Sequence, residues 1–309
     1  MNEFRLVFAV FLLSVIAITE VEGENEPDLL ALLRKAHNPP VAYTCKIAVS
    51  SWGSPKGDTA LLREYRLPDG RYRIEYLSPP KLKGIVIISD GKKRWRVAKG
   101  KVIWELEVNG LTSANLELLS KNYRLTVLGS TEVLGRKAWK IEIVPKVKGK
   151  FHHKFWLDSE HGIILKGVVS DEKGVPIALM TVSELEFLEP NKVKDGLFSA
   201  PKKQKTNSPK QMTKIQAQSK WSIKLPDNLP FGFVLEKIEE LELPKDSSAL
   251  HALYTDGLMR ISLFALPSDI KPSLGSSRVA IVRKKMGEKF LLIMGNINKR
   301  LLERIANEF

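Results

Sequence analysis

Histidines are the first residues to test for chemistry, because imidazole serves both as a metal ligand and as a general base. The chain holds five: His152 and His153 are adjacent, while His37, His161 and His251 stand in separate segments. Adjacent residues of a strand point to opposite faces, so the pair cannot chelate one ion. The other three lack the spacing of a metal-binding motif. We therefore expect neither a metal site nor a cofactor.

Carboxylates and serines add no support for catalysis. Asp158, Glu160, Asp171 and Glu172 are paired in the sequence, but they lie beside glycines in segments typical of turns. No Gly-x-Ser-x-Gly sequence occurs, and the glycines form no phosphate-binding loop. The sequence therefore predicts a protein that is not an enzyme and has no catalytic residues.

Basic residues are in excess, and the net charge is +14. The run 92–96 places basic side chains around Trp95, a combination that can contact RNA or an anionic surface. On a strand, however, Arg94 and Arg96 share one face and Trp95 takes the other, which is typical of a solvated face over a core face. We expect an acidic protein segment or an anionic membrane surface as partner, and no nucleic acid.

The first 23 residues have the pattern of a secretory signal peptide. Leu6 to Ile18 is apolar except for Ser14, and Val21 and Gly23 supply small residues before Glu24. The run is shorter than the roughly 20 residues that span a bilayer. We expect export to the periplasm or another extracytoplasmic space, with an uncleaved anchor as the alternative. The only cysteine, Cys45, lies in an apolar run and predicts a buried thiol.

Residues 24–199 predict a large antiparallel sheet. Its centre is a meander of three strands, Phe151 to Leu157, Ile163 to Val169 and Val175 to Phe187, separated by turns that contain Asp and Gly. The pattern gives nine or ten strands and two short helices, over residues 27–36 and 112–122. A sheet of this size must curl, and we expect a half-barrel whose concave side the helices cover.

The remainder predicts a linker and a second domain. Residues 200–220 carry lysines without acids and show no apolar periodicity, which indicates a flexible linker. Residues 221–309 regain strand patterns and end in a helix that Asn298 can cap. The fold class is thus α+β, with a half-barrel followed by a smaller α+β domain.

Large apolar side chains alternate along the predicted strands and helix of the half-barrel. They either fill the core or line a cleft for an acyl chain, and the pattern leaves both readings open. The candidates for a lipid cleft are Trp139, Ile141, Ile143, Phe155, Leu157, Leu116 and Leu119.

Several stretches together resemble the MucB/RseB family of periplasmic regulators of envelope-stress sigma factors. The segment around Trp156-Leu157-Asp158 is similar to the family's meander, a cadence that LolA-like half-barrels share. Leu229-Pro230-Phe231-Gly232-Phe233 resembles the entry to its small domain, and Tyr254-Thr255-Asp256-Gly257-Leu258 resembles its Tyr-Ser-Asp-Gly-Leu hairpin.

The resemblance implies a LolA-like half-barrel and a regulatory role. The protein would bind the exported domain of a membrane anti-sigma factor and shield it from proteolysis, with lipid or lipoprotein relieving that hold. The alternative is a LolA-type carrier of lipoprotein or lipid, although a simple carrier needs no second domain. The residues that the resemblance marks as partner-binding candidates are Phe231, Phe233, Tyr254, Asp256 and Gly257.

Overall fold

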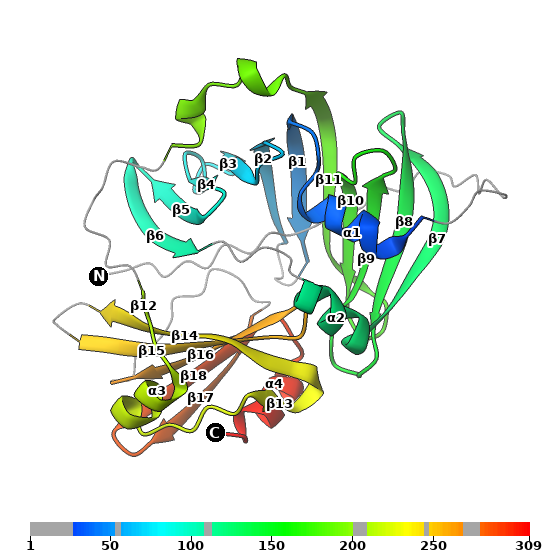
Figure 1. The fold of residues 1–309 in the computed structure, drawn as a ribbon. Coiled ribbons are helices and arrows are strands. Elements are labelled where there is room, and N and C mark those ends of the chain that lie inside the picture. The colour runs from blue at the N-terminus through cyan, green and yellow to red at the C-terminus, as the bar shows by residue number, and fades with distance from the viewer. Residues whose placement is uncertain (1–26, 53–56, 108–112, 200–208, 244–246, 268–278) are drawn as a thin grey trace.

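The computed structural model describes residues 27–52, 57–107, 113–199, 209–243, 247–267 and 279–309. The predicted signal peptide lies outside these residues. The chain forms two antiparallel sheets. In Figure 1 the larger, curled sheet lies above the smaller one. Among the described helices, none is long and apolar enough to cross a membrane.

The first sheet has 11 strands in the order β6-β5-β4-β3-β2-β1-β11-β10-β9-β8-β7. Its ends, β6 and β7, do not pair with each other, so the curled sheet stays open, as Figure 1 shows. The strands are β1 Tyr43–Ser51, β2 Asp58–Arg66, β3 Arg71–Ser78, β4 Val86–Asp90, β5 Lys93–Ala98, β6 Lys101–Glu107, β7 Tyr123–Val133, β8 Arg136–Pro145, β9 His152–Asp158, β10 Ile164–Ser170 and β11 Pro176–Phe187.

The predicted meander is confirmed as β9, β10 and β11, and its acids form turns. Asp158 Oδ1 accepts a hydrogen bond from the His161 amide, and Asp171 Oδ1 accepts from the amides of Lys173 and Val175. The sheet has 11 strands, so the prediction of nine or ten was slightly low.

Two helices lie against the β7–β9 part of this sheet (Figure 1), as predicted. Helix α1 is Leu29–His37 and begins where the Asp28 carboxylate accepts from the amides of Leu30 and Ala31. Helix α2 is Ser113–Asn122. Short 3-10 turns η1, Pro190–Lys192, and η2, Asp195–Leu197, follow the last strand.

The second sheet follows the order β12-β14-β15-β16-β18-β17, and β13 pairs with β14 beside that path. Helices α3 and α4 pack against one face of it and build its core. The elements are β12 Lys210–Gln211, α3 Lys214–Trp221, β13 Asn228–Leu229, η3 Pro230–Gly232, β14 Phe233–Leu243, β15 Ser247–Thr255, β16 Arg260–Leu266, β17 Ala280–Met286, β18 Lys289–Gly295 and α4 Lys299–Ala306.

The end of the predicted linker requires a correction. Residues 210–221 form β12 and α3, and the Ala217 and Trp221 side chains are buried in the core of the small domain. Thr213 and Gln216 form a capping box, and the αL residue Ser222 ends the helix. Only two apolar residues of α3 face the core, so its sequence is mostly polar and did not predict a packed helix. Residues 200–208 lie outside the described part of the chain.

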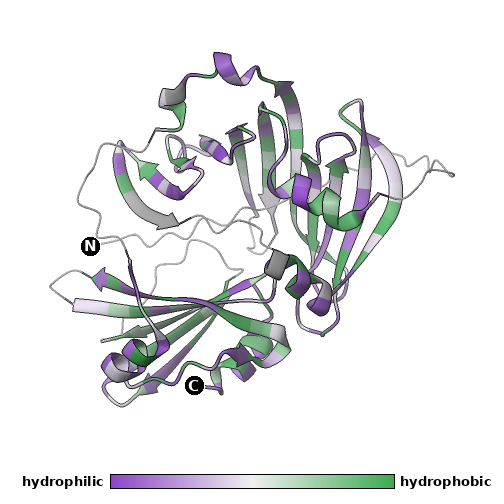
Figure 2. Ribbon diagram, viewed as in Figure 1, coloured by the Kyte–Doolittle hydropathy of each residue, from purple (hydrophilic) through white to green (hydrophobic). Residues whose placement is uncertain are grey.

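Hydropathy follows the strand period in both sheets. Figure 2 shows hydrophobic and hydrophilic residues alternating along the strands. Cys45 is buried and free, as expected. One expectation fails: Arg96 is buried rather than solvated, as is its neighbour Trp95. Two successive positions of β5 are thus buried, which simple strand alternation does not predict.

Candidate functional site

The site begins with the turn between β15 and β16, which orients the Asp256 side chain. Asp256 Oδ1 accepts hydrogen bonds from the amides of Leu258, at 3.0 Å, and Met259, at 2.7 Å. Thr255 Oγ1 accepts from the Gly257 amide at 3.1 Å and donates to the Met259 carbonyl at 3.2 Å. Such local bonds are typical of Asp and Thr in turns. They leave the second carboxylate oxygen, Oδ2, for residues of the half-barrel.

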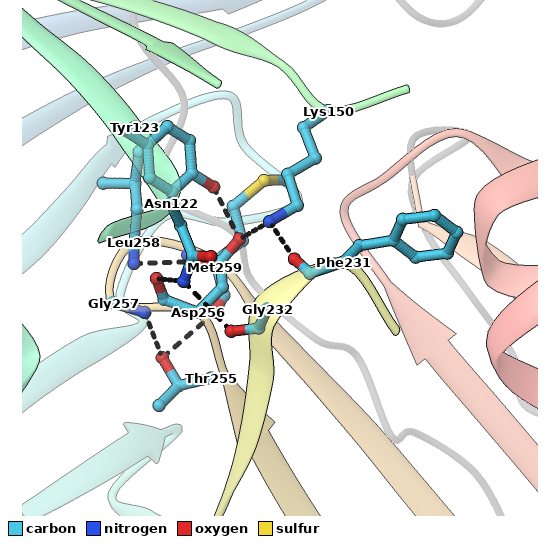
Figure 3. A network of polar contacts seen from close by, with 10 residues as sticks. All are labelled: Asn122, Tyr123, Lys150, Phe231, Gly232, Thr255, Asp256, Gly257, Leu258 and Met259. Carbon is cyan, nitrogen blue, oxygen red and sulfur yellow. Dashed lines mark hydrogen bonds and ion pairs between the residues drawn. The ribbon is translucent and has the colours of Figure 1, made fainter. Parts of the chain in front are cut away.

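Two half-barrel side chains bind that oxygen. Lys150, in the connection between β8 and β9, donates to Asp256 Oδ2 at 2.5 Å, and the Tyr123 hydroxyl at the start of β7 donates at 2.6 Å (Figure 3). Lys150 Nζ also donates to the Phe231 carbonyl at 2.7 Å. The side chains of Lys150 and Asp256 are both 0% exposed. The charge on Asp256 is thus compensated across the contact between the two domains.

The surroundings fix the protonation of these groups. Burial lowers the pKa of Lys150, while the Asp256 carboxylate opposes that change. Lys150 Nζ lies 5.2 Å from the Tyr123 ring centroid and 4.7 Å from that of Phe233, so two aromatic faces also favour the cation. Burial raises the pKa of the Tyr123 phenol, and the charge on Asp256 raises it further. Tyr123 therefore remains a protonated donor.

Close backbone approaches complete the contact. Asn122 Nδ2 donates to the carbonyls of Gly232, at 3.0 Å, and Asp256, at 2.9 Å. A Cβ at Gly232, where φ is +79°, would lie 1.8 Å from Asn122 Oδ1. A Cβ at Gly257, where φ is +96°, would lie 2.5 Å from the Leu119 amide nitrogen. Glycine is required at both positions by conformation and by space. We call Asn122, Tyr123, Lys150, Gly232, Asp256 and Gly257 the domain junction.

His153 adds a titratable group beside the junction. Burial lowers its pKa to about 4, although Asp256 favours the charged form, and His152 lowers the pKa further. Its ring stacks on Phe155 at a centroid distance of 6.0 Å. Its Nε2 atom is buried without a hydrogen-bond partner among the described residues. His153 is therefore a neutral imidazole close to a buried ion pair.

The seven candidates for a lipid cleft do lie together. They form one apolar cluster with Leu32 and Leu33 of α1, and all except Phe155 are buried. In this arrangement α1 and α2 occupy the concave side over β7 to β9. A lipid would have to displace a helix to reach these side chains, and lipid binding there stays a prediction.

The five partner-binding candidates all lie at or next to the domain junction. Asp256 and Gly257 belong to it, and the Phe231 carbonyl accepts from Lys150. Phe233, Tyr254 and Asp256 are each 0% exposed. Tyr254 donates to the Pro226 carbonyl at 3.0 Å, and the Arg304 guanidinium lies 4.6 Å from the Phe231 ring centroid. The structure gives these residues contacts within the chain, and direct contact with a partner stays a prediction.

An open groove of about 320 Å³ lies beside the junction, between α2 and the small sheet. Its lining residues come from both domains, so its shape depends on how the junction holds them. They are Asn115, Glu117, Leu118, Lys121, Val234, Glu236 and Thr255.

A second polar cluster lies within the small sheet. His251 Nδ1 is 3.2 Å from Glu239 Oε2, and its Nε2 is 3.1 Å from Ser262 Oγ, on neighbouring strands. This order of carboxylate, imidazole and hydroxyl has the contacts of a catalytic triad. Ser262, however, stands within a regular strand paired on both sides, which differs from the sharp turn that exposes a nucleophile. We call Glu239, His251 and Ser262 the sheet row.

Other charges hold the sheet row in place. Burial on its own raises the pKa of Glu239, but hydrogen bonds from His251 and Lys237 outweigh it and lower that pKa. The His251 ring stacks on Phe264 at 4.5 Å. Among the described residues, no group of three or more His, Cys, Asp or Glu could hold a metal ion.

Sequence reasoning did not single out Lys150, Tyr123 or Asn122, and it named Gly232 only within the stretch 229–233 that carries the family resemblance. The one local signal is Lys150 itself, which stands between Gly149 and the aromatic Phe151 after a run of exposed lysines. The hydrogen-bond partners of that lysine, the Phe231 carbonyl and the Asp256 carboxylate, lie 81 and 106 residues away in the sequence, so no short motif could have revealed them.

The fold and the junction together define a class of two-domain protein: an open antiparallel half-barrel joined through buried polar contacts to a small α+β domain. Residues 86–212 match the family model described as the MucB/RseB N-terminal domain. Over these residues the chain is similar to the MucB/RseB family.

Two relatives and two solved structures are similar to the chain over a larger part of its length. The chain is 30% identical over 210 residues to the sigma-E factor regulatory protein RseB of Haemophilus influenzae, a match covering 63% of this chain and 62% of the relative. It is 25% identical over 203 residues to the sigma factor AlgU regulatory protein MucB of Pseudomonas aeruginosa, covering 61% of this chain and 60% of the relative. The match thus spans less than two thirds of either relative.

The fold likeness extends further than the sequence likeness. The structure of the Pseudomonas aeruginosa MucA/MucB complex matches with a TM-score of 0.63 at 19% identity, covering 90% of this chain and 96% of that chain. A crystal structure of MucB matches with a TM-score of 0.61 at 18% identity, with the same coverage. The expected fold class, a half-barrel plus a smaller α+β domain, is confirmed.

Proposed function

We propose that this protein is an exported, non-enzymatic regulator that binds the exported domain of a membrane anti-sigma factor and controls its proteolysis. The observation that carries the proposal is the likeness, along 90% of the chain, to MucB in a complex with MucA. The similarity to a sigma-E factor regulatory protein supports the same role. Export, periplasmic location and cleavage of the leader are part of this proposal.

The domain junction gives the proposal a physical basis. A regulator that covers an extended partner needs surfaces on both domains in a fixed relation. The Lys150–Asp256 pair and the glycines at 232 and 257 hold α2 and the β15–β16 turn together. The partner would then meet one composite surface, and the net charge of +14 favours rapid association with an acidic segment.

The test is binding of the mature protein to the exported domain of the anti-sigma factor of the same organism. We expect micromolar or tighter binding by titration calorimetry, and slower digestion of that domain by the protease that degrades it. Asp256→Asn should weaken binding, because it loosens the junction. The matched control is Asp227→Asn, whose side chain is 71% exposed. Absence of binding at micromolar concentrations would overturn the proposal.

Lipid or lipoprotein is the proposed signal that relieves this hold, and a LolA-type carrier of lipoprotein or lipid is the alternative function. Because α1 and α2 fill the concave side over β7 to β9, acyl-chain binding requires one of them to move. Native mass spectrometry of freshly purified protein tests both ideas. A bound acyl-bearing mass without affinity for the anti-sigma domain would favour the carrier.

A further inference from the structure

The last strand of the small sheet offers an edge for pairing. Strand β17 is hydrogen bonded to β18 and ends the sheet order. Its register runs from Ala280 opposite Gly295 to Met286 opposite Lys289 without a shift, and it contains no proline. A regular edge strand is a template for another extended segment.

Within the described part of the chain, two other edge strands differ from β17 in length or regularity. Strand β12 has two residues. Strand β7 has a register shift between Val127 and Ser130, around Gly129 with φ at +98°. Helix contacts do not distinguish the two strands, because β7 contacts α1 and α2 and β17 contacts α4. Short strands, bulges and covering helices are the usual protections of an edge.

The side chains of β17 define what can pair with it. Ala280, Val282 and Met286 pack against the core on the side of α3 and α4. Ile281 packs on the opposite face, and strand alternation places Arg283 and Lys285 there too. Arg283 and Lys285 are both exposed, and the half-buried Lys284 lies between them.

The positive charges of Arg283 and Lys285 favour pairing of β17 with an acidic strand. A second copy of β17 would place like charges opposite each other, which is unfavourable across strands. A segment with acidic residues two positions apart would place both carboxylates opposite Arg283 and Lys285. An apolar residue further along would lie opposite Ile281. The same basic residues therefore oppose self-association and favour an acidic partner.

We propose that β17 is the docking edge for an extended acidic segment of the partner protein, which adds to the small sheet as a further strand. Main-chain hydrogen bonds would supply affinity, and the Ile281, Arg283 and Lys285 face would supply specificity. The assignment of that partner as the anti-sigma domain rests on the proposed function.

Hydrogen exchange measured by mass spectrometry tests the edge directly, in the mature full-length protein. The first probe is a synthetic peptide in which glutamate alternates with valine and threonine. A peptide of the same composition with a central proline is the control, because proline cannot complete the ladder. We expect the first peptide to slow exchange in residues 280–286, with no change in β12, and the proline peptide to leave both strands unchanged.

Charge reversal provides a second measurement. Arg283→Glu with Lys285→Glu should weaken peptide binding by about tenfold or more at low ionic strength. Lys83→Glu with Lys92→Glu makes the same charge change at exposed half-barrel positions, and should change binding by less than about threefold. Equal binding of the proline peptide, or equal loss in both double variants, would overturn the proposal.

The exported anti-sigma domain and anionic vesicles complete the experiment. If the domain binds without protecting residues 280–286, the edge proposal fails and the proposed function stands. If the domain does not bind while the peptide protects the edge, the proposed function fails and the edge proposal stands. Vesicles that protect β17 as well as the peptide does would make this edge a membrane contact and overturn the proposal.

Discussion

The domain junction and the sheet row are both charged clusters built from residues distant in sequence, but they differ in what surrounds them. The Lys150–Asp256 pair is wholly buried between two domains, and its atoms are bound on every side by backbone and side-chain donors and acceptors. The sheet row lies within a single sheet, and its His251 side chain is 12% exposed. The domain junction does not have the residue arrangement of a catalytic site. The sheet row has the carboxylate–imidazole–hydroxyl contacts of a catalytic triad.

The difference shows that the type of residues in a cluster is a poor guide to its role. A buried ion pair that loses one partner leaves an uncompensated charge, so the junction is sensitive to change. Removal of one hydroxyl from the sheet row costs a single hydrogen bond, so it should change the free energy of unfolding only slightly. We therefore assign the junction to domain arrangement and the sheet row to local stability, and four predictions test that contrast.

The largest effect is expected from Lys150→Met, which keeps the length of the side chain and removes its charge. The Asp256 carboxylate would remain buried without its cation, and we expect a loss of about 3–5 kcal/mol in the free energy of unfolding. Denaturant unfolding measures it. Lys148→Met, at an exposed position two residues away, is the control. Equal stability of the two variants would contradict a central role for the junction.

Gly232→Ala should come next, because its Cβ would collide with the Asn122 side chain. Gly174 has nearly the same φ, +82°, but nothing lies within 4 Å of its added Cβ. Gly174→Ala therefore reports the cost of the backbone conformation alone, about 1–2 kcal/mol. We expect Gly232→Ala to cost about 1–3 kcal/mol more than this control in the same unfolding measurement.

A third, smaller effect concerns pH. The pKa of His153 falls from its ordinary value of 6.5 to about 4 in the folded protein. Between these values the unfolded chain binds the proton and the folded chain does not, so stability falls as pH drops from about 6.5 to about 4. His153→Phe should reduce that loss by about 1–2 kcal/mol, measured by urea unfolding at the two pH values. His152→Phe is the control, and the same reduction in both variants would contradict the assignment to His153.

The smallest effect is expected in the sheet row. Ser262→Ala removes one hydrogen bond to His251 and should cost less than about 1 kcal/mol. A fluorophosphonate probe, which labels activated serines, should leave the wild-type protein unmodified in intact-mass analysis. A covalent adduct at Ser262 that is lost in His251→Gln would show that the row is catalytic and would reverse the comparison.

The sequence predicted the helices, strands and turns better than the tertiary contacts between them. The meander, the capping of the last helix by Asn298 and the turn at Thr255-Asp256-Gly257 follow from local periodicity and turn chemistry, and the structure confirms them. The helix α3 was missed, because only Ala217 and Trp221 form its buried apolar face and most of its other residues are polar. Strand alternation alone also predicted the wrong exposure for Arg96, which is buried together with Trp95.

The domain junction was beyond local reasoning for a different reason. Asp256 was marked by a resemblance in its own hairpin, but Lys150 and Tyr123 lie 106 and 133 positions from it. Lys146 and Lys148 are exposed and Lys150 is buried, and nothing in the local sequence distinguishes the three. The sheet row was missed likewise, since pairing of Glu239 with His251 depends on the register of β14 and β15.

The junction also sets an order of events during biosynthesis. Lys150 leaves the ribosome long before Asp256, because 106 positions separate them. Until the β15–β16 turn has been made, the half-barrel holds a cation and a phenol without their carboxylate. Incomplete surfaces of this kind make partly folded chains prone to aggregation. The half-barrel therefore gains its last buried contacts only when the small domain has been synthesised and packs against it.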